Sequence, residues 1–297
     1  MKILILGIDA LEFDLVEKWD LKHLKQLEYG KTIVPLIEGW KEPATVIVWP
    51  CFITGEKDPK EMGYDSPILF IKPLDWFFNY VHRPIREFIF RHQYADDISD
   101  KETSQKVLNI FKDLTKKSGF TRSPTKKDIK AKTIFENNNF KSIHMHIPVF
   151  DEEMDTLERW KIFDVFDGKM NMADFIKGYR KEFNKRCKEL EYLLENKDWD
   201  LLMMYWFFLD PIQHALFKDE MKIMNAYLLV NDFVGKIKEK LSDEDMILIV
   251  SDHGQKKGIH TNYGFYSCNK KLGLKNPHIC DFKELLEEKL TKGVKQR

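Results

Sequence analysis

The chain has 297 residues and equal numbers of basic and acidic side chains, 48 of each, so its formal net charge is zero. This balance argues against a general nucleic-acid-binding role, which usually requires an excess of basic residues. No stretch reaches the roughly 18 consecutive apolar residues that a membrane-spanning helix needs, and the N-terminus lacks the pattern of a signal peptide. Four scattered cysteines without a CxxC motif favour reduced thiols. We therefore expect a cytoplasmic protein without a membrane span.

Apolar runs alternate with amphipathic segments along most of the chain. The first run, residues 2–8, shows no polar alternation, which indicates a strand covered on both faces as in a parallel sheet. Residues 15–28 have the apolar spacing of a helix. Further strands are predicted at 140–148, 199–210 and 245–250, and further helices at 173–196 and 219–241. This alternation predicts an α/β fold with a mostly parallel central sheet and helices on both faces.

Residues 64–132 interrupt this pattern. They are rich in aromatic and basic side chains, with a predicted helix at 104–119 followed by a predicted loop at 121–127. We interpret them as a helical lid inserted into a single domain that covers residues 1–297.

Acids and histidines cluster where three of the predicted strands end. In open α/β sheets, ligands bind beyond the carboxyl ends of the strands, so these side chains should converge at one edge. Each residue alone has a simpler explanation; an isolated Asp9, for example, could cap a helix. Together, however, three carboxylates would repel one another unless cations neutralised them. The expected ligands are Asp9, Asp210, His214, Asp252, His253 and His260.

The chemistry of these expected ligands indicates which metal ions they would bind. Imidazole together with carboxylate suits Zn²⁺ or Mn²⁺ better than Ca²⁺. Six ligands are more than one tetrahedral ion requires, so we expect two divalent ions, Zn²⁺ before Mn²⁺. Gly254 directly follows Asp252 and His253 and would let the backbone turn away from the metal.

Two more histidines, His144 and His146, would lie on one face of the strand predicted at 140–148. They could contact substrate or form an additional metal site. Alternatively they are half-buried histidines at a strand end, which is the interpretation we favour.

Four motifs occur together in this chain: GIDA at 7–10, TG at 54–55, DPIQH at 210–214 and SDHG at 251–254. In combination they resemble the alkaline phosphatase superfamily, and most closely its branch of type I phosphodiesterases and nucleotide pyrophosphatases. The resemblance covers most of the chain outside residues 64–132. It implies an alkaline phosphatase-like fold and hydrolysis of a small phosphorylated substrate.

The resemblance also implies individual roles. In this family a Thr or Ser nucleophile lies ten residues before the Gly of the TG motif, which here is Thr45. It implies a phospho-threonine intermediate. One ion would be bound by Asp9, Thr45, Asp252 and His253, and the other by Asp210, His214 and His260. Nucleotide pyrophosphatases carry a phosphate-binding Asn three residues after the nucleophile, where this chain has Val48, so another group must contact that oxygen.

We therefore expect a two-metal phosphohydrolase that prefers phosphodiesters to monoesters. One alternative is a phosphomutase similar to the cofactor-independent phosphoglycerate mutases. Those enzymes carry a larger inserted domain and a Ser nucleophile, which counts against it. The other alternative is a non-catalytic protein that binds a phosphorylated ligand, although all seven expected metal-site positions are filled here. The oligomeric state has no signature in the sequence.

Overall fold

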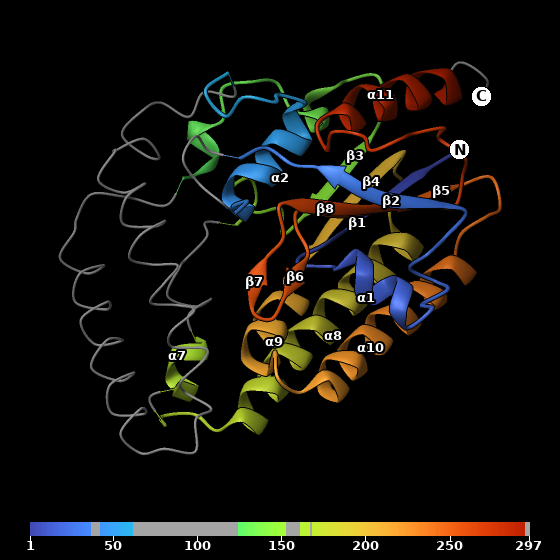
Figure 1. The fold of residues 1–297 in the computed structure, drawn as a ribbon. Coiled ribbons are helices and arrows are strands. Elements are labelled where there is room, and N and C mark those ends of the chain that lie inside the picture. The colour runs from blue at the N-terminus through green and yellow to red at the C-terminus, as the bar shows by residue number, and fades with distance from the viewer. Residues whose placement is uncertain (37–41, 62–123, 153–160, 167, 295–297) are drawn as a thin grey trace.

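A six-stranded sheet forms the centre of the molecule (Figure 1). The computed structural model describes residues 1–36, 42–61, 124–152, 161–166 and 168–294. The strand order is β2-β8-β5-β1-β4-β3. The strands are β1 (Ile3–Ile8), β2 (Glu28–Ile33), β3 (Ser142–Met145), β4 (Leu201–Trp206), β5 (Met246–Ser251) and β8 (Tyr263–Cys268). Strands β5, β1, β4 and β3 run parallel, and β8 pairs antiparallel with β5 and β2. The prediction of a mostly parallel sheet is confirmed.

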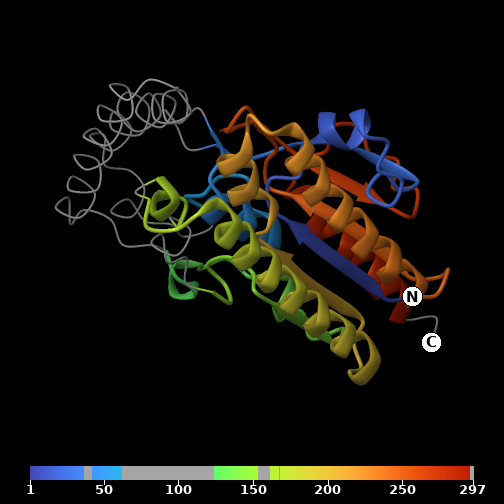
Figure 2. The same cartoon turned by 90° about the horizontal axis from the view of Figure 1, so that it is seen from below.

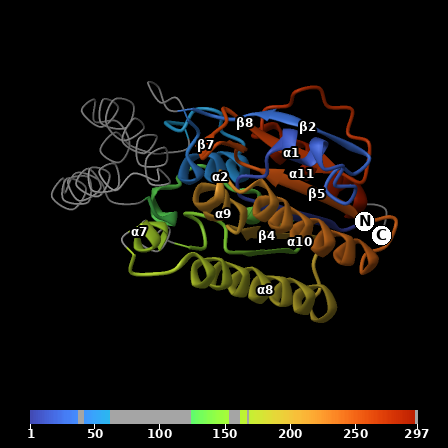
Figure 3. The same ribbon diagram turned by 60° about the horizontal axis from the view of Figure 1, so that its bottom comes forward.

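Helices cover both faces of this sheet, as predicted. One face carries α2 (Thr45–Thr54) and α11 (Asp281–Val294), which lie above the sheet in Figure 1. The other face carries α1 (Phe13–Lys18), α8 (Met172–Asn196), α9 (Leu209–Leu216) and α10 (Glu220–Glu239). Figure 2 views this second layer from outside, and Figure 3 shows it in front of the sheet.

Burial explains why the three central strands lack polar alternation. Every residue of β1, β4 and β5 is buried. Odd-numbered residues of β1, such as Ile3 and Ile5, pack into the core beneath α2 and α11. Even-numbered residues, such as Leu4 and Leu6, pack into the core beneath α8, α9 and α10. A strand between two such layers must be apolar on both sides.

Shorter elements complete the described part of the chain. They are helix α7 (Lys161–Phe166), the 3₁₀ helices Lys126–Asp128 and Ile134–Glu136, and the two-stranded hairpin of β6 (Gln255–Lys256) and β7 (Ile259–His260). None of the helices in the described ranges is both long enough and apolar enough to cross a membrane.

Two predicted elements differ from the structure. The helix expected at 15–28 ends at Lys18, because Asp20 takes a left-handed φ of 46° that a helix cannot continue through. The strand expected at 199–210 ends at Trp206, and Asp210 lies in α9 instead. The predicted lid at 64–132 lies outside the described residues except for 124–132, so the division into one domain with an insertion stays a prediction.

Candidate metal centre

The first group of predicted ligands lies directly beyond two neighbouring strands. Asp9 follows β1, and Asp252 and His253 follow β5, which pairs in parallel with β1. His253 Nε2 is 3.3 Å from Asp9 Oδ1 and 3.5 Å from Asp252 Oδ2. All three side chains are fully buried, and one potential ligand atom from each lies within 4.8 Å of the others. We call Asp9, Asp252 and His253 the strand group.

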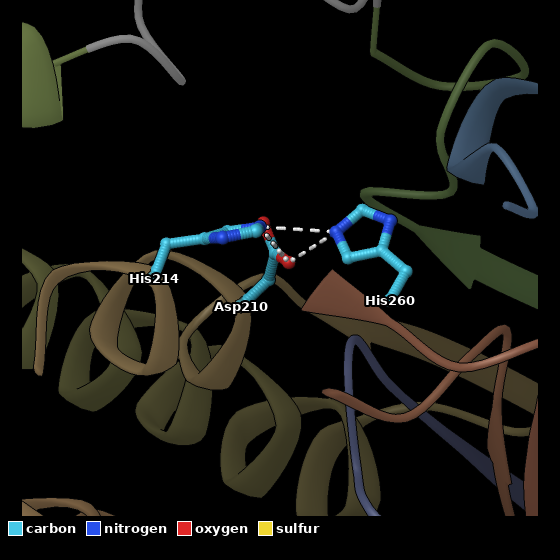
Figure 4. Close-up of side chains that lie close together, drawn as sticks. All are labelled: Asp210, His214 and His260. Carbon is cyan, nitrogen blue, oxygen red and sulfur yellow. Dashed lines mark hydrogen bonds and ion pairs between the residues drawn. The ribbon is translucent and has the colours of Figure 1, made fainter. Parts of the chain in front are cut away.

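The second group combines a helix with a hairpin (Figure 4). Asp210 and His214 are four residues apart on α9, so both side chains lie on one face of that helix. His260 comes from β7. Asp210 Oδ1 is 3.2 Å from His214 Nε2 and 3.3 Å from His260 Nε2, and the two Nε2 atoms are 3.0 Å apart. We call Asp210, His214 and His260 the α9 group.

The two groups adjoin each other. The ring of His253 stacks on the ring of His260, with 3.8 Å between centroids and 19° between planes. The structure therefore brings all six of these predicted ligands together in one region, as two groups of three. Each group offers the mixture of carboxylate oxygen and imidazole nitrogen that Zn²⁺ and Mn²⁺ accept.

The charges in these groups suit cations. Neither oxygen of the buried Asp252 carboxylate accepts a hydrogen bond from any residue that the structure describes. A buried carboxylate left in that state is costly, because it loses hydration without a replacement. A divalent ion would supply the missing charge, so the residues present fit a metal.

The protonation states also suit metal binding. Burial, together with the neighbouring His253, lowers the pKa of His260 to about 3, so this imidazole is neutral. Burial opposes ionisation of Asp210, but His214 and His260 outweigh it and hold the pKa of Asp210 well below its usual value. A neutral imidazole and an ionised carboxylate are the forms that coordinate metals.

Thr45 is the first residue of α2 and is 7% exposed. One turn later on the same face, Trp49 packs closely on Gly7 of β1, where an added Cβ would lie 2.8 Å from the indole ring. Just before the helix, Glu42 Oε2 is 3.7 Å from His260 Nδ1. The segment that leads into α2 therefore adjoins the α9 group through Glu42. Within the described ranges, no hydrogen bond joins Thr45 to either group.

Several residues that support the ligands were missed from the sequence. The Tyr205 hydroxyl of β4 donates a hydrogen bond to Asp9 Oδ2. The Gln255 amide lies 2.6 Å from His214 Nδ1. Tyr205 lies inside an apolar run and gives no signal there, whereas Gln255 directly follows the SDHG motif and Glu42 lies three residues before Thr45. Gly254 is needed for space, since an added Cβ would lie 2.0 Å from Glu12 Oε2.

His144 and His146 lie elsewhere and are bound by protein groups. His144 Nδ1 is 2.7 Å from Asp151 Oδ1, and His146 contacts Glu152 through Nδ1 and Glu189 through Nε2, the latter at 2.8 Å. The structure thus agrees with the interpretation of partly buried histidines near a strand end.

Comparison with known proteins identifies the family. The model of the type I phosphodiesterase/nucleotide pyrophosphatase family matches residues 83–273, more than half of the chain. The chain belongs to this family, within the alkaline phosphatase superfamily. The match includes the α9 group, Asp252 and His253, whereas Asp9 and Thr45 precede it.

Two solved structures are similar to this chain. Murine ectonucleotide pyrophosphatase/phosphodiesterase 5 is 13% identical with a TM-score of 0.45, over 86% of this chain and 57% of that protein. The PH0037 protein of Pyrococcus horikoshii is 12% identical with a TM-score of 0.45, over 97% of both chains. This chain therefore spans little more than half the length of the murine protein. No curated protein matches it.

Proposed function

We propose that the protein is a phosphohydrolase with two divalent metal ions, acting on phosphodiesters through a phospho-threonine intermediate. The observation that carries this proposal is the pair of adjoining ligand groups, one of which contains the Asp252 carboxylate that accepts no hydrogen bond from the described residues. Membership of the phosphodiesterase family supports the same reaction class.

The strand group together with Thr45 would hold one ion, and the α9 group would hold the other. Zn²⁺ is the first candidate and Mn²⁺ the second, because each group mixes carboxylate and imidazole. When bound, such ions lower the pKa of a coordinated hydroxyl and neutralise the charge that develops on the phosphoryl oxygens.

Thr45 would act as the nucleophile. Its hydroxyl oxygen forms a bond to phosphorus while the bond from phosphorus to the leaving alkoxide breaks, and the alkoxide takes up a proton. Water then attacks the phosphoryl group on Thr45, which releases a phosphomonoester and restores the hydroxyl. Two such steps separate one difficult displacement into two easier ones.

The start of α2 would assist in binding the phosphoryl group. Ala44, at the N-cap, provides no side-chain hydrogen bond to the helix, and a helix N-terminus attracts anions. Val48 is fully buried in the core, so no side chain at that position can bind the phosphate oxygen. The N–H groups of Ile47 and Val48 already donate to the Ala44 carbonyl, so in our proposal the bound ions and the positive end of the helix dipole neutralise this oxygen.

The expected substrate is a small phosphorylated molecule, with a diester preferred to a monoester. We place the protein in the cytoplasm, which the four free cysteine thiols support.

Hydrolysis of bis(p-nitrophenyl) phosphate and p-nitrophenyl phosphate by the Zn²⁺- or Mn²⁺-loaded protein tests the proposal. We expect the diester to react faster. Thr45→Ala should lower kcat/KM at least about 1,000-fold, whereas Thr45→Ser keeps a hydroxyl and should retain measurable activity. Rapid quenching of the diester reaction should trap one p-nitrophenyl phosphoryl group on the peptide that contains Thr45.

Thr54→Ala is the matched control. Thr54 is buried at the other end of α2 and donates a hydrogen bond to the Pro50 carbonyl at 2.7 Å, so its loss should affect stability but not turnover. Equal activity of Thr45→Ala and wild type would exclude Thr45 as the nucleophile. Metal binding without hydrolysis would support a binding protein, and transfer of the phosphoryl group to a second hydroxyl of the substrate would support a phosphomutase.

A further inference from the structure

Gln255 is a buried residue next to the α9 group with no assigned role. It is 3% exposed, and its side-chain amide lies 2.6 Å from His214 Nδ1. The Nε2 atom of the same imidazole faces Asp210 and His260. Gln255 therefore lies behind the nitrogen that is turned away from the candidate metal position.

The backbone of Gln255 is connected to the other histidine of the group. In the β6–β7 hairpin, Gln255 is the register partner of His260. Its side chain thus contacts the imidazole on α9, while its main chain is paired with the residue that carries the second imidazole. Gln255 is therefore in contact with both His214 and His260, although 46 positions separate these two histidines in the chain.

Metal binding through Nε2 sets a requirement at Nδ1. A neutral imidazole carries one proton, so an unprotonated Nε2 ligand requires the proton to be on Nδ1. A buried Nδ1–H then needs an acceptor, and such outer partners fix the orientation and tautomer of metal-binding histidines. Of the two ends of a glutamine amide, only Oε1 can accept this hydrogen bond.

The Gln255 amide can meet that requirement by a local rotation. Its Nε2 faces His214, and its Oε1 is buried without a hydrogen-bond partner in the described part of the chain. If the amide donates to Nδ1 in this arrangement, a neutral His214 carries its proton on Nε2, toward Asp210. A half-turn of the amide presents Gln255 Oε1 to His214 Nδ1 instead. Oε1 then accepts a hydrogen bond from Nδ1–H, and the Nε2 atom of His214 is left unprotonated.

We propose that Gln255 is a positioning residue for the α9 group, whose amide selects the Nδ1–H tautomer of His214 and orients Nε2 toward the metal. This inference rests on the proposed function, because it assumes an ion at the α9 group. Glutamine suits both states of the site, since its amide can donate to Nδ1 in one orientation and accept from Nδ1–H in the other.

Three variants measured by equilibrium metal binding test this inference. Gln255→Leu removes both polar ends at similar size, Gln255→Glu keeps only acceptors, and Gln26→Leu removes a half-buried amide elsewhere, which binds the Ser267 carbonyl at 3.0 Å. Co²⁺ and Zn²⁺ affinities are obtained by chelator competition, and the tautomer of His214 by the ¹⁵N chemical shifts of its ring. Circular dichroism establishes that each variant is folded.

We expect Gln255→Leu to lower the affinity of one of the two metal sites about 10- to 100-fold and to leave the other unchanged. Gln255→Glu should bind that metal within about threefold of wild type, and Gln26→Leu should not change it. In the loaded wild type, the ring shifts should show His214 protonated on Nδ1.

Wild-type affinity in Gln255→Leu, or an equal loss in Gln26→Leu, would overturn the inference while the proposed function stands. A loaded wild type with His214 protonated on Nε2 would also overturn it. If the wild-type protein binds no divalent ion, the proposed metal chemistry fails and this inference fails with it. The affinity and tautomer measurements require no turnover, so an inactive but metal-binding protein would contradict only the catalytic part of the proposal.

Discussion

Two clusters of histidines and acids in this molecule have similar composition and different chemistry. Around His146, the acids Glu152 and Glu189 bind the two nitrogens of the ring. Arg186 then adds its own charge, with Nη2 3.1 Å from both carboxylate oxygens of Glu152. In the strand group, by contrast, Asp252 accepts no hydrogen bond from any described residue.

The difference shows that the source of positive charge distinguishes a structural cluster from a candidate metal centre. The His146 cluster contains a guanidinium, so its carboxylates are already neutralised and hydrogen-bonded. The strand group leaves a fully buried carboxylate for which an external cation would be the natural partner.

The largest contrast should be in metal affinity and turnover. Asp252→Asn removes a ligand charge and should lower metal affinity by more than the roughly 100-fold that loss of an outer partner can cause, with a corresponding loss of kcat/KM. Glu152→Gln should leave both within about threefold of wild type. Chelator competition and diester hydrolysis measure the two effects, and similar losses in the two variants would remove the distinction.

The next effect concerns the stability of the His146 cluster. Arg186→Met removes the guanidinium from Glu152 and also removes the hydrogen bond to the Tyr205 carbonyl, at 3.0 Å. We expect a loss of about 2–3 kcal/mol in the free energy of unfolding, below the roughly 3–5 kcal/mol of a fully buried pair because Glu152 is partly exposed. Urea denaturation measures it. Lys185→Met on the same helix is exposed and should change stability by under about 0.5 kcal/mol.

A smaller effect is the difference in stability between Asp252→Asn and wild type, which should change sign when metal is added. In metal-free protein, Asp252→Asn removes a buried carboxylate that accepts no hydrogen bond from the described residues and lies 3.5 Å from His253 Nε2, so the variant should be about 1–2 kcal/mol more stable than wild type. With saturating Zn²⁺ the order should reverse, because wild type binds the ion more tightly and ligand binding stabilises the native state. Thermal denaturation with and without chelator tests this. A metal-free variant less stable than wild type would indicate that the contact with His253 already compensates the Asp252 carboxylate.

The smallest effect is a pH dependence in the His146 cluster. Burial opposes protonation of His146, but hydrogen bonds to Glu152 and Glu189 outweigh it and raise its pKa above the usual 6.5. The resulting stabilisation is present in full below about pH 6.5 and is lost as pH rises through the raised value. His146→Gln should therefore cost about 1–2 kcal/mol near pH 6 and less near pH 9, by urea denaturation. A cost that grows with pH would contradict this assignment.

The sequence predicts the convergence of ligands because it depends on one general property of the fold. Buried strands are recognisable from apolar runs, and parallel strands end at a common edge, so Asp9 and Asp252 could be placed near each other. Asp210 was placed at that edge for the wrong reason, since the apolar run continues past Trp206 into α9 and hides the end of the strand.

Other features depend on contacts that a single sequence does not contain. Strand β8 pairs antiparallel with both β5 and β2, in a register that only the folded chain defines. The partners of His214 and His146 come from segments 41 and 43 positions away, with Gln255 and Glu189 reaching them through tertiary packing. Thr45 could be numbered from its motif, but its place at the start of a helix required the structure.

The strand group and the α9 group are attached to the fold by elements of different rigidity. The strand group is borne by the ends of two adjacent, hydrogen-bonded strands, which hold it in place whether or not metal is bound. The α9 group instead spans an eight-residue helix and a two-residue strand of a separate small ladder. An ion bound there would link α9 to the β6–β7 hairpin. Removing the ion with a chelator should therefore accelerate amide hydrogen exchange in the hairpin while leaving β1 and β5 protected.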